Sequence, residues 1–238
     1  MSGVKRSVKQ LLGRTISREQ LEKLTEYAIA EREPSLSLRN AKTVVPTGTS
    51  WEDVIEGGRQ TLWRDTLARV GRPELLLLEF GVWTGQSMRQ LVGLNANPSS
   101  RFFGFDSFEG LPEDWRGMAA ERFDVGGVMP KIDDQRVKLV KGWFRDSLPP
   151  MMDELAELAR DRALVVHFDA DLYSSTLYLL FTLGSRFKRY HFIFDEFSGH
   201  ETRALFNYMQ ATGATADYFY RLDWQGFPQV VSGELTLP

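Results

Sequence analysis

Short apolar runs alternate with helical segments along most of this chain, and this alternation limits its fold more than any other feature. The apolar runs cover residues 75–80, 101–105, 137–140, 164–168 and 191–194, and segments with helical periodicity follow four of them. A continuous apolar run of this length is typical of a strand that is buried on both faces. The pattern therefore predicts an α/β fold with a mostly parallel sheet covered by helices on both faces.

Two regions flank this alternating part. Residues 1–70 are predicted to form an N-terminal helical extension, with one helix opened by a capping box at Ser17 and another running from Ser50 to about Val70. We expect this extension to make contacts with an acceptor substrate or with a second subunit in a possible homodimer. Residues 71–238 then form one domain, in which two late apolar stretches close the sheet as an antiparallel pair.

Composition excludes several classes of protein. The net charge is −3 and the pI is about 5.7, which gives no support for a nucleic-acid partner. The chain has no cysteine, so disulfides and thiolate metal sites are excluded. The N-terminal residues lack the apolar run of a signal peptide, and the longest apolar stretches are too short to span a membrane. We therefore expect a cytoplasmic protein without a membrane partner.

Acidic residues collect where the predicted strands end. Ligands of open parallel sheets bind beyond the carboxyl ends of the strands, so these acids are the first candidates for a functional site. They are Glu79, Asp106, Asp169, Asp171, Asp195 and Glu196.

The turn after the first apolar run has the features of a nucleoside-binding loop. Gly81 and Gly85 allow a tight turn and a close approach of the backbone to a ligand. Asp106 follows at the end of the next strand, where an acid can accept both ribose hydroxyls. The G-x-x-x-G spacing differs from the G-x-G-x-x-G of dinucleotide sites. Glu79, before the first glycine, favours a ligand with an ammonium group, and S-adenosylmethionine (SAM) fits both points.

Four segments of the sequence resemble motifs of the macrocin O-methyltransferase family. The resemblance runs in order from about residue 75 to residue 200 and covers roughly half of the chain. It implies a class I methyltransferase, with a Rossmann-like, doubly wound sheet of seven mostly parallel strands, an antiparallel last strand and extra N-terminal helices. It also implies SAM-dependent O-methylation, often of a sugar hydroxyl of a natural product and often with Mg²⁺. The four segments are residues 79–87, 105–112, 141–149 and 168–176.

The same resemblance implies a cofactor site. Glu79, Gly81 and Gly85 would line the amino-acid end of SAM, and Asp106 would hold its ribose. Trp143 would lie near the adenine, although a core aromatic under a lid at residues 108–135 is an equal alternative. The complete implied set is Glu79, Gly81, Trp83, Thr84, Gly85, Ser87, Asp106, Ser107, Gly142, Trp143 and Asp169.

Carboxylates at the ends of the fourth and fifth predicted strands suggest the catalytic group. Like charges that converge raise one another's pKa unless a cation neutralises them, so we expect Asp169, Asp195 and Glu196 to bind Mg²⁺. Asp169 or Asp171 would take the proton of the acceptor hydroxyl. Structural alternatives remain open: Asp171 as a helix cap, and Glu196 as a solvated loop charge.

The sequence therefore predicts a SAM-dependent O-methyltransferase that acts on a small polyhydroxylated acceptor. Two alternatives remain: a SAM-fold binding protein without catalysis, and a nicotinamide-dependent oxidoreductase. The glycine spacing and the lack of an evident Tyr/Lys or His proton relay count against the oxidoreductase.

Overall fold

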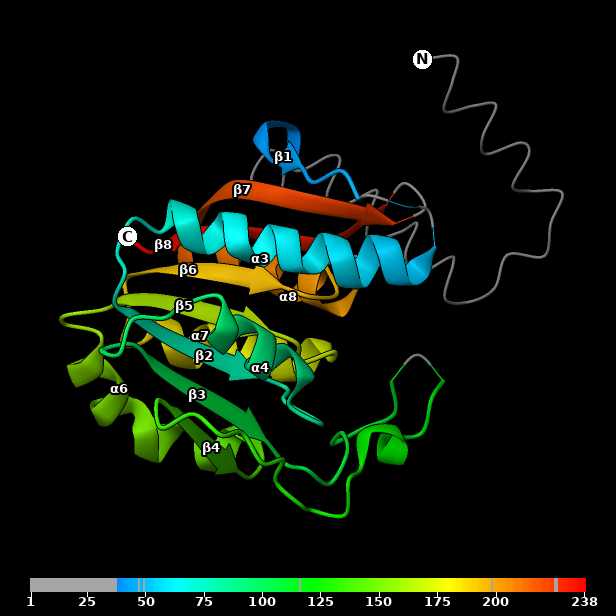
Figure 1. Cartoon of the computed structure of the whole chain (residues 1–238), viewed down its shortest axis with the longest axis vertical. Helices are drawn as coiled ribbons and strands as arrows, with labels where there is room; N and C mark the ends of the chain where they lie inside the picture. Colours follow the sequence, from blue (N-terminus) through cyan, green and yellow to red (C-terminus); the bar gives the residue numbers. More distant parts are fainter. Residues whose placement is uncertain (1–37, 47, 49, 116, 198, 225–226) are drawn as a thin grey trace, which may run out of the picture.

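The computed structural model describes residues 38–46, 48, 50–115, 117–197, 199–224 and 227–238. In this part of the chain, eight strands form one sheet in the order β1-β7-β8-β6-β5-β2-β3-β4 (Figure 1). The strands are β1 (Lys42–Thr43), β2 (Leu75–Phe80), β3 (Arg101–Asp106), β4 (Val137–Lys141), β5 (Ala163–Phe168), β6 (Arg189–Phe194), β7 (Thr215–Trp224) and β8 (Phe227–Thr236).

The sheet confirms the predicted mostly parallel topology with an antiparallel last strand. Strands β2 to β6 are parallel where they pair, and β8 runs antiparallel to both β6 and β7. One strand was not predicted. Lys42 and Thr43, within the predicted helical extension, pair in parallel with Tyr220 and Arg221. Two residues are too few to show the alternation by which a strand is recognised.

Helices cover both faces of the sheet in two layers. Helices α3 and α4 lie in front of the sheet in Figure 1, and α6, α7 and α8 lie behind it. A separate apolar core fills each space between a helical layer and the sheet. The helices are α3 (Gly58–Arg69), α4 (Gln86–Gly93), α5 (Phe144–Ser147), α6 (Met152–Leu158), α7 (Tyr173–Gly184) and α8 (His200–Thr212).

The entry to α3 follows the predicted capping pattern. A π-helical turn, η3 (Glu52–Gly57), leads directly into α3. The Asp53 N–H donates to Ser50 Oγ at 3.0 Å, and the Ser50 hydroxyl donates to Asp53 Oδ2 at 2.8 Å. The first of these bonds satisfies a backbone donor that a helix start leaves free, and the second holds the two side chains together. The helix predicted from Ser17 lies outside the described residues. Within the described ranges, no helix is both long enough and apolar enough to cross a membrane.

The alternation of side chains along β2 brings an acid into the core. All six residues of β2 are buried. Leu76, Leu78 and Phe80 face the α6–α7–α8 layer, whereas Leu75 and Leu77 face the α3–α4 layer. Because successive side chains of a strand point to opposite faces, Glu79 points toward the α3–α4 layer.

Candidate functional site

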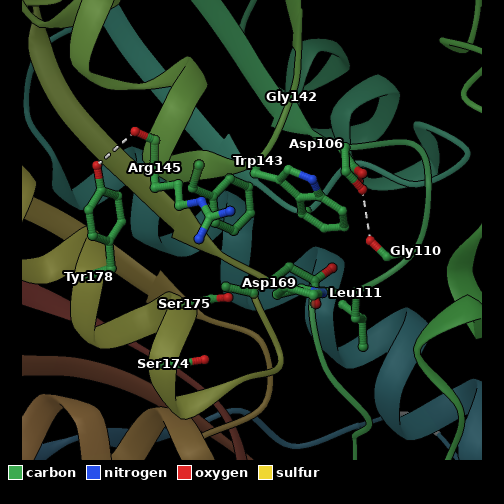
Figure 2. A pocket seen from close by; sticks show the side chains of 15 residues that line it. Asp106, Gly110, Leu111, Gly142, Trp143, Arg145, Asp169, Ser174, Ser175 and Tyr178 are labelled. Carbon is green, nitrogen blue, oxygen red and sulfur yellow. Dashed lines mark hydrogen bonds between the residues drawn. The ribbon is translucent and has the colours of Figure 1, made fainter.

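A cavity of about 490 Å³ lies at the carboxyl ends of β2, β3, β4 and β5 (Figure 2). This is the edge of the sheet at which open α/β folds bind ligands. In Figure 2, Trp143 lies between Asp106 and Arg145, and Leu111 and Asp169 lie below it. The lining residues are Gly81, Asp106, Ser107, Gly110, Leu111, Pro112, Gly142, Trp143, Phe144, Arg145, Asp169, Ala170, Ser174, Ser175 and Tyr178.

Gly81 joins three strand ends at the floor of this cavity. Its N–H donates to Phe105 O at 3.0 Å, and the Asp169 N–H donates to Phe80 O at 2.9 Å. The Gly81 φ is +96°, and a Cβ at this position would overlap the carbonyl oxygen of Asp169. Only glycine therefore combines this left-handed conformation with such a close approach of two strand ends.

Asp106 holds the glycine loop through backbone donors. Its Oδ2 accepts hydrogen bonds from the N–H groups of Val82 and Trp83, both at 2.7 Å, and its Oδ1 accepts one from Phe108 at 2.7 Å. An ionised carboxylate offers about four acceptor positions, so three bonds leave capacity for about one more. The sequence predicts that Asp106 accepts both ribose hydroxyls, whereas this arrangement leaves direct room for one.

Described residues of the segment 108–135 lie against the cavity and the glycine loop, where the ring centroids of Phe123 and Trp83 are 5.8 Å apart. Leu111 and Pro112 line the cavity directly. The Ser174 hydroxyl at the start of α7 donates to Glu113 Oε1 at 2.6 Å, which connects this segment to the helix. Trp143 is only partly buried and lines the cavity, so its ring is accessible to a ligand.

A row of alternating charged and titratable groups lies near the carboxyl ends of the strands, on the α3–α4 face of the sheet. His167 of β5 is fully buried and stands opposite Glu79 in the register of β2 and β5. Its Nδ1 lies 3.0 Å from Glu79 Oε1, and its Nε2 lies 3.6 Å from Asp195 Oδ1. On the other side of Asp195, Arg59 Nη1 lies 3.2 Å from Oδ2. The order of charges is therefore carboxylate, imidazole, carboxylate, guanidinium.

These neighbours shift the pKa values of three groups. Burial lowers the pKa of His167, but Asp195 and Glu79 outweigh burial and raise it to about 10. Burial raises the pKa of Asp195, but Arg59 and His167 together hold it below its usual value. For Asp169, burial and the charge of Asp195 prevail and raise the pKa to about 8. At neutral pH His167 and Asp195 are therefore ionised, whereas Asp169 holds a proton that it releases in mildly alkaline solution.

The stability of the fold should depend on the charge of His167. The pKa of His167 is about 10 in the folded chain and about 6.5 in an unfolded chain. Its stabilising contribution is therefore complete below pH 6.5 and is lost as the pH rises to 10. We expect urea unfolding to show that wild type exceeds His167→Gln in stability most at pH 6, with a gap that narrows toward pH 10.

A matched control is His191→Gln, because burial lowers the pKa of His191 instead of raising it. Its stability gap from wild type should not narrow between pH 6.5 and pH 10. A gap for His167→Gln that stayed constant over this range would contradict a charged His167.

The predicted Mg²⁺ ligands do not form a cation site in this arrangement. No group of three His, Asp or Glu residues suited to a metal occurs in the described part of the chain. Asp195 already lies against His167 and Arg59, with one oxygen toward each. Neither Asp195 nor Glu196 lines the cavity. The donor set therefore does not fit a divalent cation, because two protein cations take up the charge of its central ligand.

The predicted cofactor residues divide into two groups. Those that line the cavity are Gly81, Asp106, Ser107, Gly142, Trp143 and Asp169; those that lie behind or beside it are Glu79, Trp83, Thr84, Gly85 and Ser87.

Three charged residues near the acids were not identified as site residues from the sequence. His167 lies inside the apolar run at residues 164–168, where a lone histidine usually belongs to the core. Arg59 stands more than 100 positions before Asp195 and does not belong to any recognised motif. Glu201, in the first turn of α8, is fully buried and accepts a hydrogen bond from the Glu196 N–H at 3.1 Å. Its spacing after Glu196 was the only signal available.

Comparison with known proteins gives the family resemblance independent support. The family model of macrocin-O-methyltransferase (TylF) matches residues 129–227. Over these residues the chain is similar to the macrocin O-methyltransferases. The matched segment contains the third and fourth motifs recognised in the sequence, and the first two lie before it.

The chain is also similar to a curated O-methyltransferase from Streptomyces olivaceus. This relative is 8-demethyl-8-(2,3-dimethoxy-alpha-L-rhamnosyl)-tetracenomycin-C 4'-O-methyltransferase, with 31% identity over 125 residues. The match covers 42% of this chain and 44% of the relative, so the similarity spans less than half of that protein.

Solved structures show the same fold. The O-methyltransferase NovP superposes with a TM-score of 0.55 at 23% identity, covering 74% of this chain and 78% of NovP. The calicheamicin methyltransferase CalS11 superposes with a TM-score of 0.54 at 19% identity, covering 94% of each chain. The predicted class I methyltransferase fold is thereby confirmed.

Proposed function

We propose that this macrocin O-methyltransferase-like chain transfers the methyl group of SAM to a hydroxyl of a small glycosylated acceptor. The observation that carries the proposal is the cavity at the carboxyl edge, where Gly81, Asp106, Trp143 and Asp169 meet. A cavity of about 490 Å³ is within the usual range for small-molecule sites.

The buried end of the site supports the choice of SAM. Glu79 Oε1 faces His167, whereas Oε2 is buried without a hydrogen-bond partner in the described structure. A buried carboxylate oxygen without a donor is costly, and an ammonium group would supply one. Asp106 and Trp143, which line the cavity, would hold the ribose and the adenine face, and Glu79, behind the cavity, would attract the amino group by its charge. Bound SAM supplies an electrophilic methyl group.

We assign the proton transfer to Asp169. This carboxyl group lines the cavity, and its raised pKa suits a base that works near neutral pH. Asp169 would accept the proton of the acceptor hydroxyl while the oxygen forms its bond to the methyl carbon and the carbon–sulfur bond breaks. The products are a methyl ether, neutral S-adenosylhomocysteine and protonated Asp169, which returns its proton to solvent.

Asp171 follows in an unusual backbone conformation. Its φ is +58°, which is rare for a residue other than glycine and is often found at functional sites. We propose that it shapes the turn before α7, whose Ser174 and Ser175 line the cavity.

The names of the relatives support the class of acceptor that we propose. The Streptomyces olivaceus relative is named for a rhamnosyl tetracenomycin, and CalS11 for calicheamicin. We propose an acceptor that presents a sugar hydroxyl toward Asp169, with contacts from the segment at residues 108–135 and from the extension at residues 1–70. Mg²⁺ has no role in the steps proposed for this chain, because the acids do not fit it.

Isothermal titration calorimetry tests the cofactor assignment. We expect S-adenosylhomocysteine to bind with one site per chain and NAD to produce no heat, because the turn lacks the spacing of a dinucleotide site. Incubation with SAM and the rhamnosyl tetracenomycin should then yield a product heavier by one methylene unit. Binding of NAD instead would support the oxidoreductase alternative. Binding of S-adenosylhomocysteine without methyl transfer to any of a panel of glycosides would support the non-catalytic alternative.

A further inference from the structure

Arg59 lies beside the carboxylate of Asp195, one of the predicted Mg²⁺ ligands, where a bound cation would otherwise lie. The residue lies in the first turn of α3, and its Nη1 is 3.2 Å from Asp195 Oδ2. Its side chain is 24% exposed, whereas that of Asp195 is only 7% exposed. The guanidinium also lies over the Trp63 ring, with Cζ 5.7 Å from the centroid. Packing and charge therefore both hold Arg59 in this place.

Asp195 is tied to the proposed catalytic base. Its N–H donates to Phe168 O at 3.0 Å, directly before Asp169. The positive charge of Arg59 beside Asp195 therefore acts at the same edge of the sheet at which a bound divalent ion would act. On the other side of this carboxylate, His167 Nε2 lies 3.6 Å from Asp195 Oδ1.

We propose that Arg59 is a built-in counter-ion that replaces a divalent cation at Asp195. A cation that approached Asp195 would meet the positive charge of Arg59 at a few ångströms, and at that distance repulsion is strong in a partly buried site. The acids at this edge therefore stay together without a metal, and methyl transfer proceeds without one. This inference deepens the proposed function, but cation affinity is measurable without any turnover.

The test is a titration of the metal-free protein with Mn²⁺, followed by electron paramagnetic resonance. Arg59→Gln removes the guanidinium charge and keeps a polar side chain of moderate length. We expect the variant to bind Mn²⁺ at least about tenfold more tightly than wild type. Mn²⁺ should also raise the melting temperature of Arg59→Gln but not that of wild type. Each protein is compared with itself with and without Mn²⁺, so the test works even if the variant is less stable.

Two further variants separate the local charge from a general effect. Arg59→Lys keeps the positive charge and should bind Mn²⁺ as weakly as wild type. Arg64→Gln removes an exposed arginine of the same helix, which pairs with Asp65 at 3.5 Å, and should change nothing. In the activity assay, wild type should be as fast with EDTA as with added Mg²⁺.

Equal Mn²⁺ affinity of wild type and Arg59→Gln would overturn the inference, and so would loss of wild-type activity in EDTA that Mg²⁺ restores. A chain without methyltransferase activity would contradict the proposed function, but the Mn²⁺ titration would still decide the role of Arg59.

Discussion

Replacement of Asp169 by asparagine is expected to lower kcat by about 10²- to 10⁴-fold, because the variant loses the group proposed to accept the acceptor's proton. Asparagine has nearly the same shape, and the Asp169 N–H bond to Phe80 O involves only the backbone. Affinity for S-adenosylhomocysteine should therefore change little. Steady-state rates with saturating SAM and the rhamnosyl tetracenomycin measure the first effect, and calorimetry measures the second.

The pH dependence of the reaction rate tests the same assignment of the base. Because the pKa of Asp169 is raised to about 8, the wild-type rate should increase with pH up to about 8 and then level off. Asp169→Asn should lose this dependence. Asp171→Asn is the matched comparison, since it removes a neighbouring carboxylate that does not line the cavity. If Asp171→Asn showed the larger loss of kcat, the assignment of the base to Asp169 would be wrong.

Most of the longer strands and helices were predictable because they have a local signal. The run of leucines in β2 is buried on both faces, and such a run has few alternatives in a chain of this kind. The Ser50–Asp53 cap was also visible in the sequence, since its two partners are three positions apart. By contrast, β1 depends on pairing with a strand about 180 positions later, and its two residues carry no pattern that predicts this pairing.

The strand-end acids were predictable as a group, but their partners were not. The alternation along β2 shows that Glu79 shares a face with Leu75 and Leu77, yet it does not reveal which residue lies opposite. The register of β2 and β5 places His167 there, and register is fixed by the packing of the whole sheet. The partner of Asp195 was not predictable for the same reason, since Arg59 reaches Asp195 from a helix that is distant in sequence.

Asp106→Ala is expected to weaken the binding of S-adenosylhomocysteine by at least about a hundredfold. The variant loses the acceptor proposed for a ribose hydroxyl, and hydrogen bonds to a charged group are worth about 1.5–3 kcal/mol each. It also releases the N–H groups of Val82, Trp83 and Phe108, which order the glycine loop. Calorimetry measures the affinity, and circular dichroism checks that the variant is folded.

A thermodynamic cycle with the 2′-deoxy analogue of S-adenosylhomocysteine separates the two losses. If Asp106 binds the ribose, removal of the 2′-hydroxyl should weaken binding to wild type but change binding to Asp106→Ala little. If Asp106 only orders the loop, the hydroxyl should contribute equally in both proteins. Asp134→Ala is the control, because Asp134 also accepts a backbone N–H, from Arg136 at 2.9 Å, but lies outside the cavity. Unchanged affinity in a folded Asp106→Ala variant would count against a nucleoside in this cavity, since no other acid lines its β3 side.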